Sequence, residues 1–239
     1  MPNRIFLIHG YVEDPTIFDK LVPLLPPANY VRINLADEFL RWQPTGPINV
    51  RLLAQYLTDH YKITADDLVI GHSMGGWTAI NIKQVSGAGA IQLASFTNQK
   101  KILLPTDNLT VLKLLLNSGT TQSRTLNNYF KKKYPFDESR ELYNRLVDGS
   151  MRMTRQYLWQ QLQTLFAKVP PLTVQPDLRI HARHDNIVGP PDETFVEVPG
   201  DHFSLFFHPA LVAAPIRTLL SSDNFNTETQ RTTQRNGEE

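Results

Sequence analysis

The segment Gly71-His72-Ser73-Met74-Gly75 has the residue types that enzymes use to build a serine nucleophile. An apolar run, Leu68-Val69-Ile70, precedes it, and a helix-like stretch follows it. In a strand–turn–helix of this kind the serine hydroxyl projects from a sharp turn, and the flanking glycines leave room for the bend. The residue after the serine opens the helix, so its free N–H can stabilise an oxyanion. We therefore expect Ser73 to be a nucleophile and the amide of Met74 to be an oxyanion-hole donor.

A serine nucleophile needs a base that removes its proton, and His202 is the best-placed histidine for this role. It lies between the last predicted strand and the last predicted helix. Open parallel sheets bind ligands at the carboxyl ends of their strands, where this loop would bring the imidazole over the serine. A histidine beside a glycine-containing turn can also be an ordinary surface residue. The other histidines considered fall within or at the start of predicted helices and strands: His60, His181 and His208.

The base needs an acid that fixes its tautomer, and Asp185 is the candidate because it follows the penultimate predicted strand. An aspartate at this point can also simply form a turn. Asp201 is adjacent to the candidate base and would reach the far ring nitrogen with difficulty, whereas Asp192 is a more credible substitute. The trio His181, His184 and Asp185 raises the question of a metal site. Residues three apart on a strand point to opposite faces, so we expect no metal.

The loop after the first predicted strand should supply the second oxyanion donor. This loop begins His9-Gly10-Tyr11, and the amide of Tyr11 is the one placed to donate. We expect His9 itself to be an architectural hydrogen-bonding residue and not a catalyst.

The hydrophobic pattern predicts the elements that position these residues. Short apolar runs predict strands, and apolar residues at helical spacing predict helices. This alternation with short links indicates a parallel sheet with helices on both faces. We expect strands at residues 4–8, 30–35, 68–72 and 90–96, and helices at 15–25, 50–61 and 74–85.

From about residue 98 to 171 the pattern is only helical. Strands are expected again at 178–181 and 194–198, and a last helix at 209–220. The chain should therefore consist of a core of residues 1–97 and 172–220, a helical cap inserted at 98–171, and a disordered polar tail at 221–239.

A cap needs apolar side chains on the face that covers the site. Met153, Tyr157 and Trp159 are candidates for such a pocket. Large apolar residues in a helical segment more often form its core, and that alternative stays open for each of the three.

Composition limits the partners. With 24 basic and 23 acidic residues among 239, the net charge of +1 gives no electrostatic case for nucleic-acid binding. We interpret Lys131-Lys132-Lys133 as a solvated helix face. The absence of cysteine excludes disulfides, thiolate metal sites and a cysteine nucleophile. The first apolar stretch, about five residues long, is too short for a signal peptide or a membrane span, so we expect a cytoplasmic protein.

With these residues assembled, the chain resembles the α/β-hydrolase superfamily. The resemblance rests on His9-Gly10, on residues 71–76, and on Asp185 followed by His202, in the chain order Ser, Asp, His. It extends over residues 4–220, the helical cap included. It implies an acyl-enzyme mechanism in which the serine attacks a carbonyl carbon, the histidine removes the serine proton and the aspartate stabilises the imidazolium. Water then releases the acid, and no cofactor is implied.

The chain departs from the family pattern at three places. It starts at the strand equivalent to the family's third, so the leading antiparallel strands are not expected. Residues 36–42 lack the Gly-rich turn that many relatives carry after the second strand. Only residues 186–193 separate the last two predicted strands, whereas a parallel crossover usually needs a dozen or more residues with a helix. Either that helix is reduced to a turn or the last strand lies elsewhere.

Three functions fit these residues. The first is hydrolysis of a carboxylic ester with a small or medium acyl group. The second is hydrolysis of coenzyme A or carrier-protein thioesters, because residues 200–205 are similar to the His-Phe turn of accessory thioesterases. The third is a ligand-binding homologue that keeps the triad but hardly turns over. The expected partner is a small-molecule ester or thioester. The sequence leaves open the oligomeric state and does not separate these functions from lyase or C–C bond hydrolase chemistry.

Overall fold

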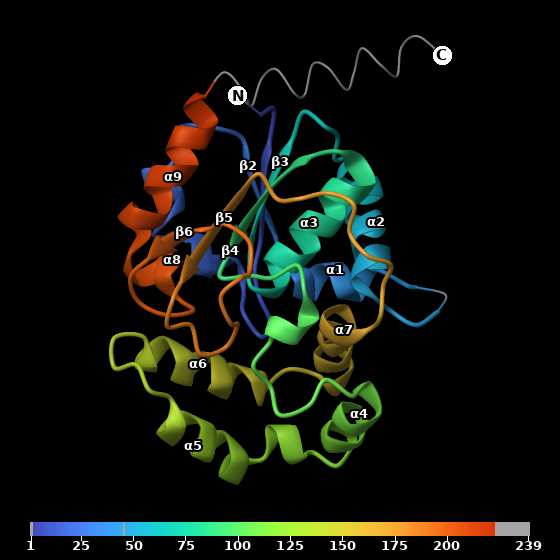
Figure 1. The fold of residues 1–239 in the computed structure, drawn as a ribbon. Coiled ribbons are helices and arrows are strands. Elements are labelled where there is room, and N and C mark those ends of the chain that lie inside the picture. Colours follow the sequence, from blue (N-terminus) through green and yellow to red (C-terminus); the bar gives the residue numbers. More distant parts are fainter. Residues whose placement is uncertain (1, 45, 223–239) are drawn as a thin grey trace.

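A computed structural model describes residues 2–44 and 46–222, and its centre is a six-stranded parallel sheet (Figure 1). The strand order is β2-β1-β3-β4-β5-β6, and every paired neighbour runs parallel. This arrangement confirms the expected fold class. The strands are β1 (Ile5–Ile8), β2 (Tyr30–Ile33), β3 (Leu68–His72), β4 (Gly89–Leu93), β5 (Leu178–Ala182) and β6 (Val196–Val198).

The central strands are apolar throughout because both faces of the sheet are covered. In β1, Phe6 and Ile8 pack against one hydrophobic cluster while Ile5 and Leu7 pack against another, as the alternation of side chains along a strand requires. The first cluster includes residues of α2 (Val50–Tyr61) and α3 (Met74–Ser86), and the second includes residues of α9 (Pro209–Ser221). Figure 1 shows α9 and the pair α2 and α3 on opposite sides of the sheet.

Two elements between β1 and α2 differ from the sequence prediction. The helix expected at 15–25 is instead a pair of short 3-10 helices, η1 (Pro15–Phe18) and η2 (Val22–Leu24). A proline near the start of η2 has no N–H to continue the hydrogen-bonded ladder from η1. Asp14 caps η1, since its side chain accepts from the amide of Thr16. Residues 36–42, treated as a loop, lie mostly in α1 (Leu35–Arg41), which Asn34 caps.

Four α-helices lie between β4 and β5, as the helical periodicity predicted. They gather at one end of the sheet, below it in Figure 1. The helices are α4 (Leu109–Asn117), α5 (Arg124–Lys133), α6 (Arg140–Ser150) and α7 (Arg155–Phe166), with short turns η3 (Gln99–Lys101) and η4 (Thr120–Gln122).

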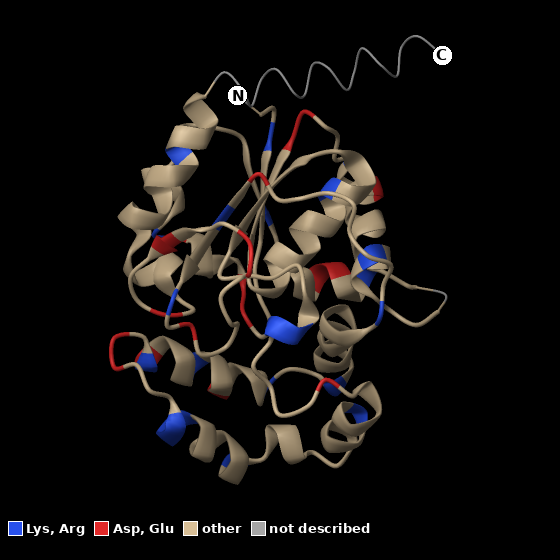
Figure 2. Ribbon diagram, viewed as in Figure 1, with Lys and Arg blue, Asp and Glu red and all other residues tan. Residues whose placement is uncertain are grey.

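The charged residues are distributed over helices and loops, both around the sheet and in the segment between β4 and β5 (Figure 2). On α4 and α5 the charged residues are all basic. In the run expected to be a solvated helix face, Lys132 and Lys133 are exposed, while half-buried Lys131 forms an ion pair with Asp148 of α6.

The connection from β5 to β6 contains no helix, one of the two possibilities that its short length in the sequence left open. Residues 183–195 connect β5 to β6 without a helix, and β6 nevertheless pairs parallel with β5. Val188 in this connection forms an isolated antiparallel bridge with Ile102, which ties the loop to the segment after β4. A short helix not expected from the sequence, α8 (Ser204–Phe207), precedes α9. The predicted tail falls almost entirely outside the described residues, and none of the described helices is long and apolar enough to cross a membrane.

Candidate active site

Ser73 lies at the junction of β3 and α3, in a backbone conformation that L-residues rarely adopt. Its φ is 52° and its ψ is −119°. Two contacts hold this turn: the Ser73 amide donates to the carbonyl of Leu93, and the hydroxyl of Ser95 donates to the Ser73 carbonyl. A Cβ on Gly75 would lie 1.9 Å from the carbonyl oxygen of Ile8. The close approach of the backbones therefore requires glycine here, and the strained turn is held from several sides.

Asp185 and His202 form a direct hydrogen bond. His202 Nδ1 lies 2.7 Å from Asp185 Oδ2, and both side chains are buried. The other carboxylate oxygen, Oδ1, accepts from the amides of Ile187 and Val188, each at 2.8 Å. Oδ2 therefore faces the imidazole and accepts its Nδ1 proton, which leaves Nε2 free to act as a base.

Burial acts to raise the pKa of Asp185, but His202, His181 and the Val188 amide together outweigh it and hold that pKa below its ordinary value. Asp185 is thus a carboxylate at neutral pH, the form that accepts the imidazole N–H.

Two backbone amides are unpaired within the described residues, one in the loop after β1 and one at the start of α3. The amides of Tyr11 and Met74 donate no hydrogen bond to any residue that the structure describes. Tyr11 lies in a tight turn, in which the neighbouring Val12 has a φ of 54°. The Val12 amide donates to Oε1 of Gln161 on α7, at 2.9 Å, so the helical segment between β4 and β5 contacts this loop directly. Such a pair of unpaired amides is the usual composition of an oxyanion hole.

A second carboxylate, Glu13, belongs to this site, although the sequence did not single it out. Its Oε2 accepts from the amide of Gly10 at 2.6 Å and lies 2.9 Å from Nδ1 of His72. Nε2 of His72 lies 2.9 Å from the carbonyl oxygen of His202. A Cβ on Gly10 would lie 2.8 Å from Glu13 Oε2 and 2.9 Å from the Cβ of Ser73, so the carboxylate packs beside the Ser73 turn. The only hint in the sequence was its position in the loop after the first strand.

Glu13 and His72 influence each other's protonation. Burial acts to lower the pKa of His72, but the Glu13 carboxylate, the His202 carbonyl and Asp185 together outweigh it and the pKa is raised. Burial likewise acts to raise the pKa of Glu13, and His72 with its other partners outweighs it, so that pKa is lowered. Glu13, His72 and His202 each offer a potential metal-ligand atom, within 4.8 Å of one another. Both nitrogens of His72 already have hydrogen-bond partners, which disfavours ion binding there.

The alternative residues are engaged elsewhere. The Asp201 carboxylate accepts from Tyr134, Ser139 and the Phe203 amide, and Asp192 forms an ion pair with Lys101. His9 accepts from the amide of Leu35 through Nε2 and donates from Nδ1 to the Gly10 carbonyl, which is the architectural role expected of it. His60 packs on Tyr56 and Tyr61, and His208 bonds Glu138. Of the trio considered for a metal, His181 bonds the Val188 carbonyl and lies 3.5 Å from Asp185, whereas His184 is exposed.

A cleft of about 470 Å³ separates the loop after β1 from α6. Val12 and Glu13 line it on one side, and Met153 with residues of α6 on the other. Tyr157 is half-buried and contacts Phe39, and its buried hydroxyl has no hydrogen-bond partner among the described residues. Trp159 lies instead beneath the ammonium of Lys113 on α4. Of the three pocket candidates, Met153 therefore lines this cleft, whereas Trp159 contacts a neighbouring helix.

Comparison with known proteins agrees with this architecture. The chain belongs to the alpha/beta hydrolase family, whose sequence pattern matches residues 5–214. No curated protein sequence matches the chain.

Solved structures with the same fold include three enzymes at low identity, and at such identities the likeness establishes the fold alone. A hydrolase from Oleispira antarctica is 13% identical, with a TM-score of 0.71 over 93% of this chain and 92% of that one. A carboxylesterase from Bacillus subtilis is 12% identical, with a TM-score of 0.62 over 92% and 84%. The thioesterase from the prodiginine biosynthetic pathway in Streptomyces coelicolor is 19% identical, with a TM-score of 0.56 over 91% and 90%.

Proposed function

We propose that this protein is a serine hydrolase that cleaves a carboxylic ester of a small or medium acyl group through an acyl-enzyme at Ser73. The observation that carries this proposal is the 2.7 Å hydrogen bond between Asp185 and His202, whose carbonyl lies 2.9 Å from Nε2 of His72, the residue before the strained Ser73 turn. A serine in this conformation costs stability, and such strain is retained where a catalytic group needs it.

In the proposed mechanism His202 Nε2 takes the proton of the Ser73 hydroxyl as its oxygen attacks the carbonyl carbon. The negative charge that forms on the carbonyl oxygen is stabilised by the amides of Tyr11 and Met74. The imidazolium then gives its proton to the departing alkoxide, which leaves an acyl ester on Ser73. A water molecule, deprotonated by the same imidazole, attacks this ester; the acid leaves, and the imidazolium returns the proton to the Ser73 oxygen. Asp185 holds the imidazole tautomer in both halves of the reaction.

The helices between β4 and β5 form a cap in this proposal, inserted at residues 98–171 into a core of residues 1–97 and 172–220. The hydrogen bond from Val12 to Gln161 supports it, because it joins α7 to the loop that carries the Tyr11 amide. The cleft between that loop and α6 would admit the substrate, and Met153 would limit its size. Tyr157 is proposed to line the same pocket. Trp159, which contacts Lys113 of α4, is proposed to support the pocket without lining it.

The test is hydrolysis of p-nitrophenyl esters from acetyl to dodecanoyl, with Ser73→Ala as the matched control at every chain length. We expect turnover that peaks at one chain length and is lost in the variant. Equal turnover by the two proteins would contradict the proposal, because the nucleophile would then be another group.

A thioesterase is the second candidate. Phe203, which follows the proposed base, is buried and packs edge-on against the His202 ring, as part of the turn that is similar to those of accessory thioesterases. The fold is also shared with the prodiginine-pathway thioesterase. Matched oxygen esters and thioesters of one acyl group distinguish the two functions. A kcat/KM at least tenfold higher for the thioester would favour this candidate over the first.

A further inference from the structure

One oxygen of Glu13 contacts both the loop that carries the Tyr11 amide and the histidine that supports His202. Resting on the proposed function, we propose that Glu13 and His72 form a buried ion pair. This pair positions the loop that carries the Tyr11 amide relative to the proposed base, His202. Glu13 Oε2 accepts from Gly10 in the oxyanion loop and from Nδ1 of His72. His72 Nε2 reaches the carbonyl of His202. Residues from three separate parts of the chain are thereby joined through one carboxylate and one imidazole.

The partners of His72 determine its protonation. A backbone carbonyl only accepts hydrogen bonds, so Nε2 must carry a proton to bond the His202 carbonyl. Burial acts to raise the pKa of Glu13, but its partners hold that pKa below the ordinary value, so its ionised Oε2 only accepts hydrogen bonds, and Nδ1 of His72 must also carry a proton to complete its contact. An imidazole with protons on both nitrogens is a cation, and Glu13 is the anion that balances it.

Burial makes this arrangement specific. His72 is fully buried and Glu13 is 5% exposed, so bulk water solvates neither charge well. Removing one partner of a buried pair leaves the other uncompensated, which is far more costly than removing both. The His72 and His202 rings are 4.8 Å apart between centroids, close enough for a change of charge on one to act on the other.

Other titratable groups also surround the pair. Asp185 bonds the His202 ring, and His181 Nε2 lies 3.5 Å from Asp185 Oδ2. His9, next to Gly10, and Tyr157 on α7 are both close enough for Glu13 to influence their protonation. These groups are the same in every variant described below, so differences between the variants report on Glu13 and His72.

The expected effect on catalysis is a loss of kcat with little change in KM. Glu13→Gln keeps the shape of the side chain and one acceptor oxygen, but removes the charge that holds His72 as a cation. A small displacement of catalytic groups lowers rates strongly, so we expect kcat to fall about ten- to a hundred-fold. His72→Gln should have a loss of similar size, and the double variant should lose little more than either single one, because the two side chains act as a unit.

The pH profile separates positioning through an ion pair from simple packing. His72→Gln leaves a carboxylate without its cation beside His202, which favours the protonated base. Glu13→Gln leaves a neutral His72, which does not. The acid limb of kcat/KM should therefore lie at higher pH in His72→Gln than in Glu13→Gln, by about one unit, with the double variant close to Glu13→Gln. An identical position of the limb in both single variants, or the reverse order, would overturn the proposal.

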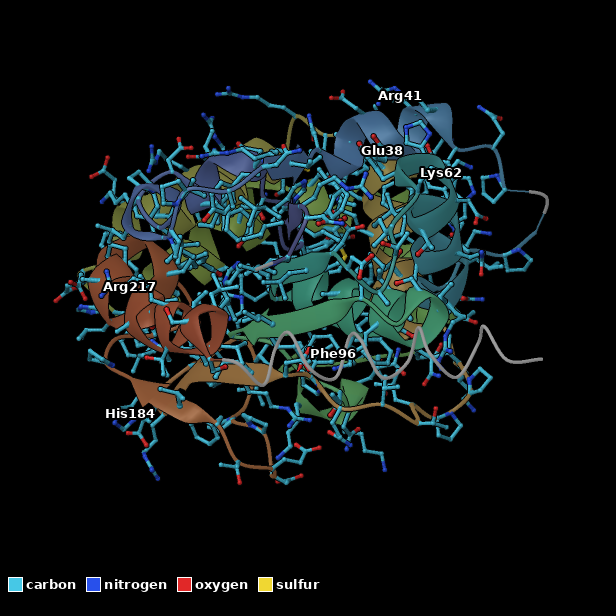
Figure 3. The ribbon with its side chains drawn as sticks, turned by 90° about the horizontal axis from the view of Figure 1, so that it is seen from above. Glu38, Arg41, Lys62, Phe96, His184 and Arg217 are labelled. Carbon is cyan, nitrogen blue, oxygen red and sulfur yellow. The ribbon has the colours of Figure 1, made fainter. Side chains whose placement is uncertain are left out.

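Glu38→Gln is the matched control. Glu38 is also a buried glutamate with several polar partners, Arg41, Tyr56 and Tyr61, and it lies with Arg41 near α2 (Figure 3). The same chemical change there should alter stability but not kcat or the acid limb. A loss of kcat in Glu38→Gln equal to that in Glu13→Gln would assign the effect to general destabilisation and would also overturn the proposal.

A measurement independent of activity completes the test. ¹⁵N NMR of the histidine side chains, with the His72 signals assigned from their absence in His72→Gln, reports protonation of each ring nitrogen. We expect both nitrogens of His72 to be protonated at neutral pH in the wild-type protein, and only one in Glu13→Gln. A neutral His72 in the wild-type protein would refute the ion pair. Absence of ester and thioester hydrolysis with an intact His72 cation would refute the proposed function instead.

Discussion

Asp185 accepts hydrogen bonds on both of its oxygens, and only one of them faces His202. Oδ1 is occupied by the amides of Ile187 and Val188, while Oδ2 lies 2.7 Å from His202 Nδ1. In Asp185→Asn the amide oxygen would stay with the two backbone N–H groups, so the NH₂ group would face the imidazole. The imidazole would then have to accept at Nδ1 and carry its proton on Nε2, the wrong tautomer for a base. We expect kcat to fall about 10³–10⁴-fold with KM nearly unchanged.

The control for this prediction is Asp192→Asn in the same connection between β5 and β6. Asp192 is exposed and pairs with Lys101 at the surface, where such pairs contribute little. Ester hydrolysis should stay within about twofold of wild type. Comparable losses in the two variants would show that the whole loop, and not the bond to His202, is what matters.

The same carboxyl should make stability depend on pH in the acid range. The pKa of Asp185 is below its ordinary value of 3.8 in the folded protein, so the unfolded chain binds its proton more readily. The stabilisation by Asp185 is therefore fully present above pH 3.8 and is lost as the pH falls toward the folded-state pKa. Urea unfolding of wild type and Asp185→Asn, repeated from neutral pH into acid, should give a difference in free energy that shrinks below that value. A difference that grows in acid would contradict the assigned direction.

The backbone strain at Ser73 can be tested by the free energy of unfolding, without reference to activity. Ser73 has a φ of 52° and a ψ of −119°, which glycine adopts far more readily than serine or alanine. We expect Ser73→Gly to be more stable than Ser73→Ala by about 1 kcal/mol, since relief of strain outweighs the added freedom of the unfolded chain. Both variants should be inactive. Equal free energies of unfolding would mean that the turn is not strained in solution.

Replacing glycine by alanine should destabilise the protein at position 75 and stabilise it at position 149. In Gly75→Ala the new Cβ would meet the Ile8 carbonyl at 1.9 Å, so β1 and α3 would have to separate. Gly149 lies inside α6 with nothing within 4 Å of an added Cβ. Gly149→Ala should stabilise the protein by about 0.5–1 kcal/mol, while Gly75→Ala should destabilise it by several times as much. Thermal unfolding of the two variants measures the difference. A Gly75→Ala protein as stable as wild type would contradict the close contact between Gly75 and the Ile8 carbonyl.

The local pattern of the sequence was sufficient for elements whose hydrophobic spacing is regular. The helix predicted at 50–61 is α2, and the strand predicted at 68–72 is β3, because each has a continuous apolar side that is buried. The same reasoning failed for 15–25, where a proline interrupts the ladder, and for α1, which at 7 residues is too short to show a helical period. Residues at strand ends could be named as candidates because parallel strands end at a common edge.

The sequence by itself determined the α/β architecture and the serine turn, since both depend on residues that are near one another in the chain. Only the tertiary structure showed that Asp185 bonds His202, and that Glu13 joins Gly10 to His72, 59 positions away. The physical reason is that such contacts depend on the register of the sheet and on the path of its loops. Ile8 pairs with Gly71, and this register brings the loop after β1 beside the turn after β3. Hydrophobic periodicity contains no information about which polar groups meet there.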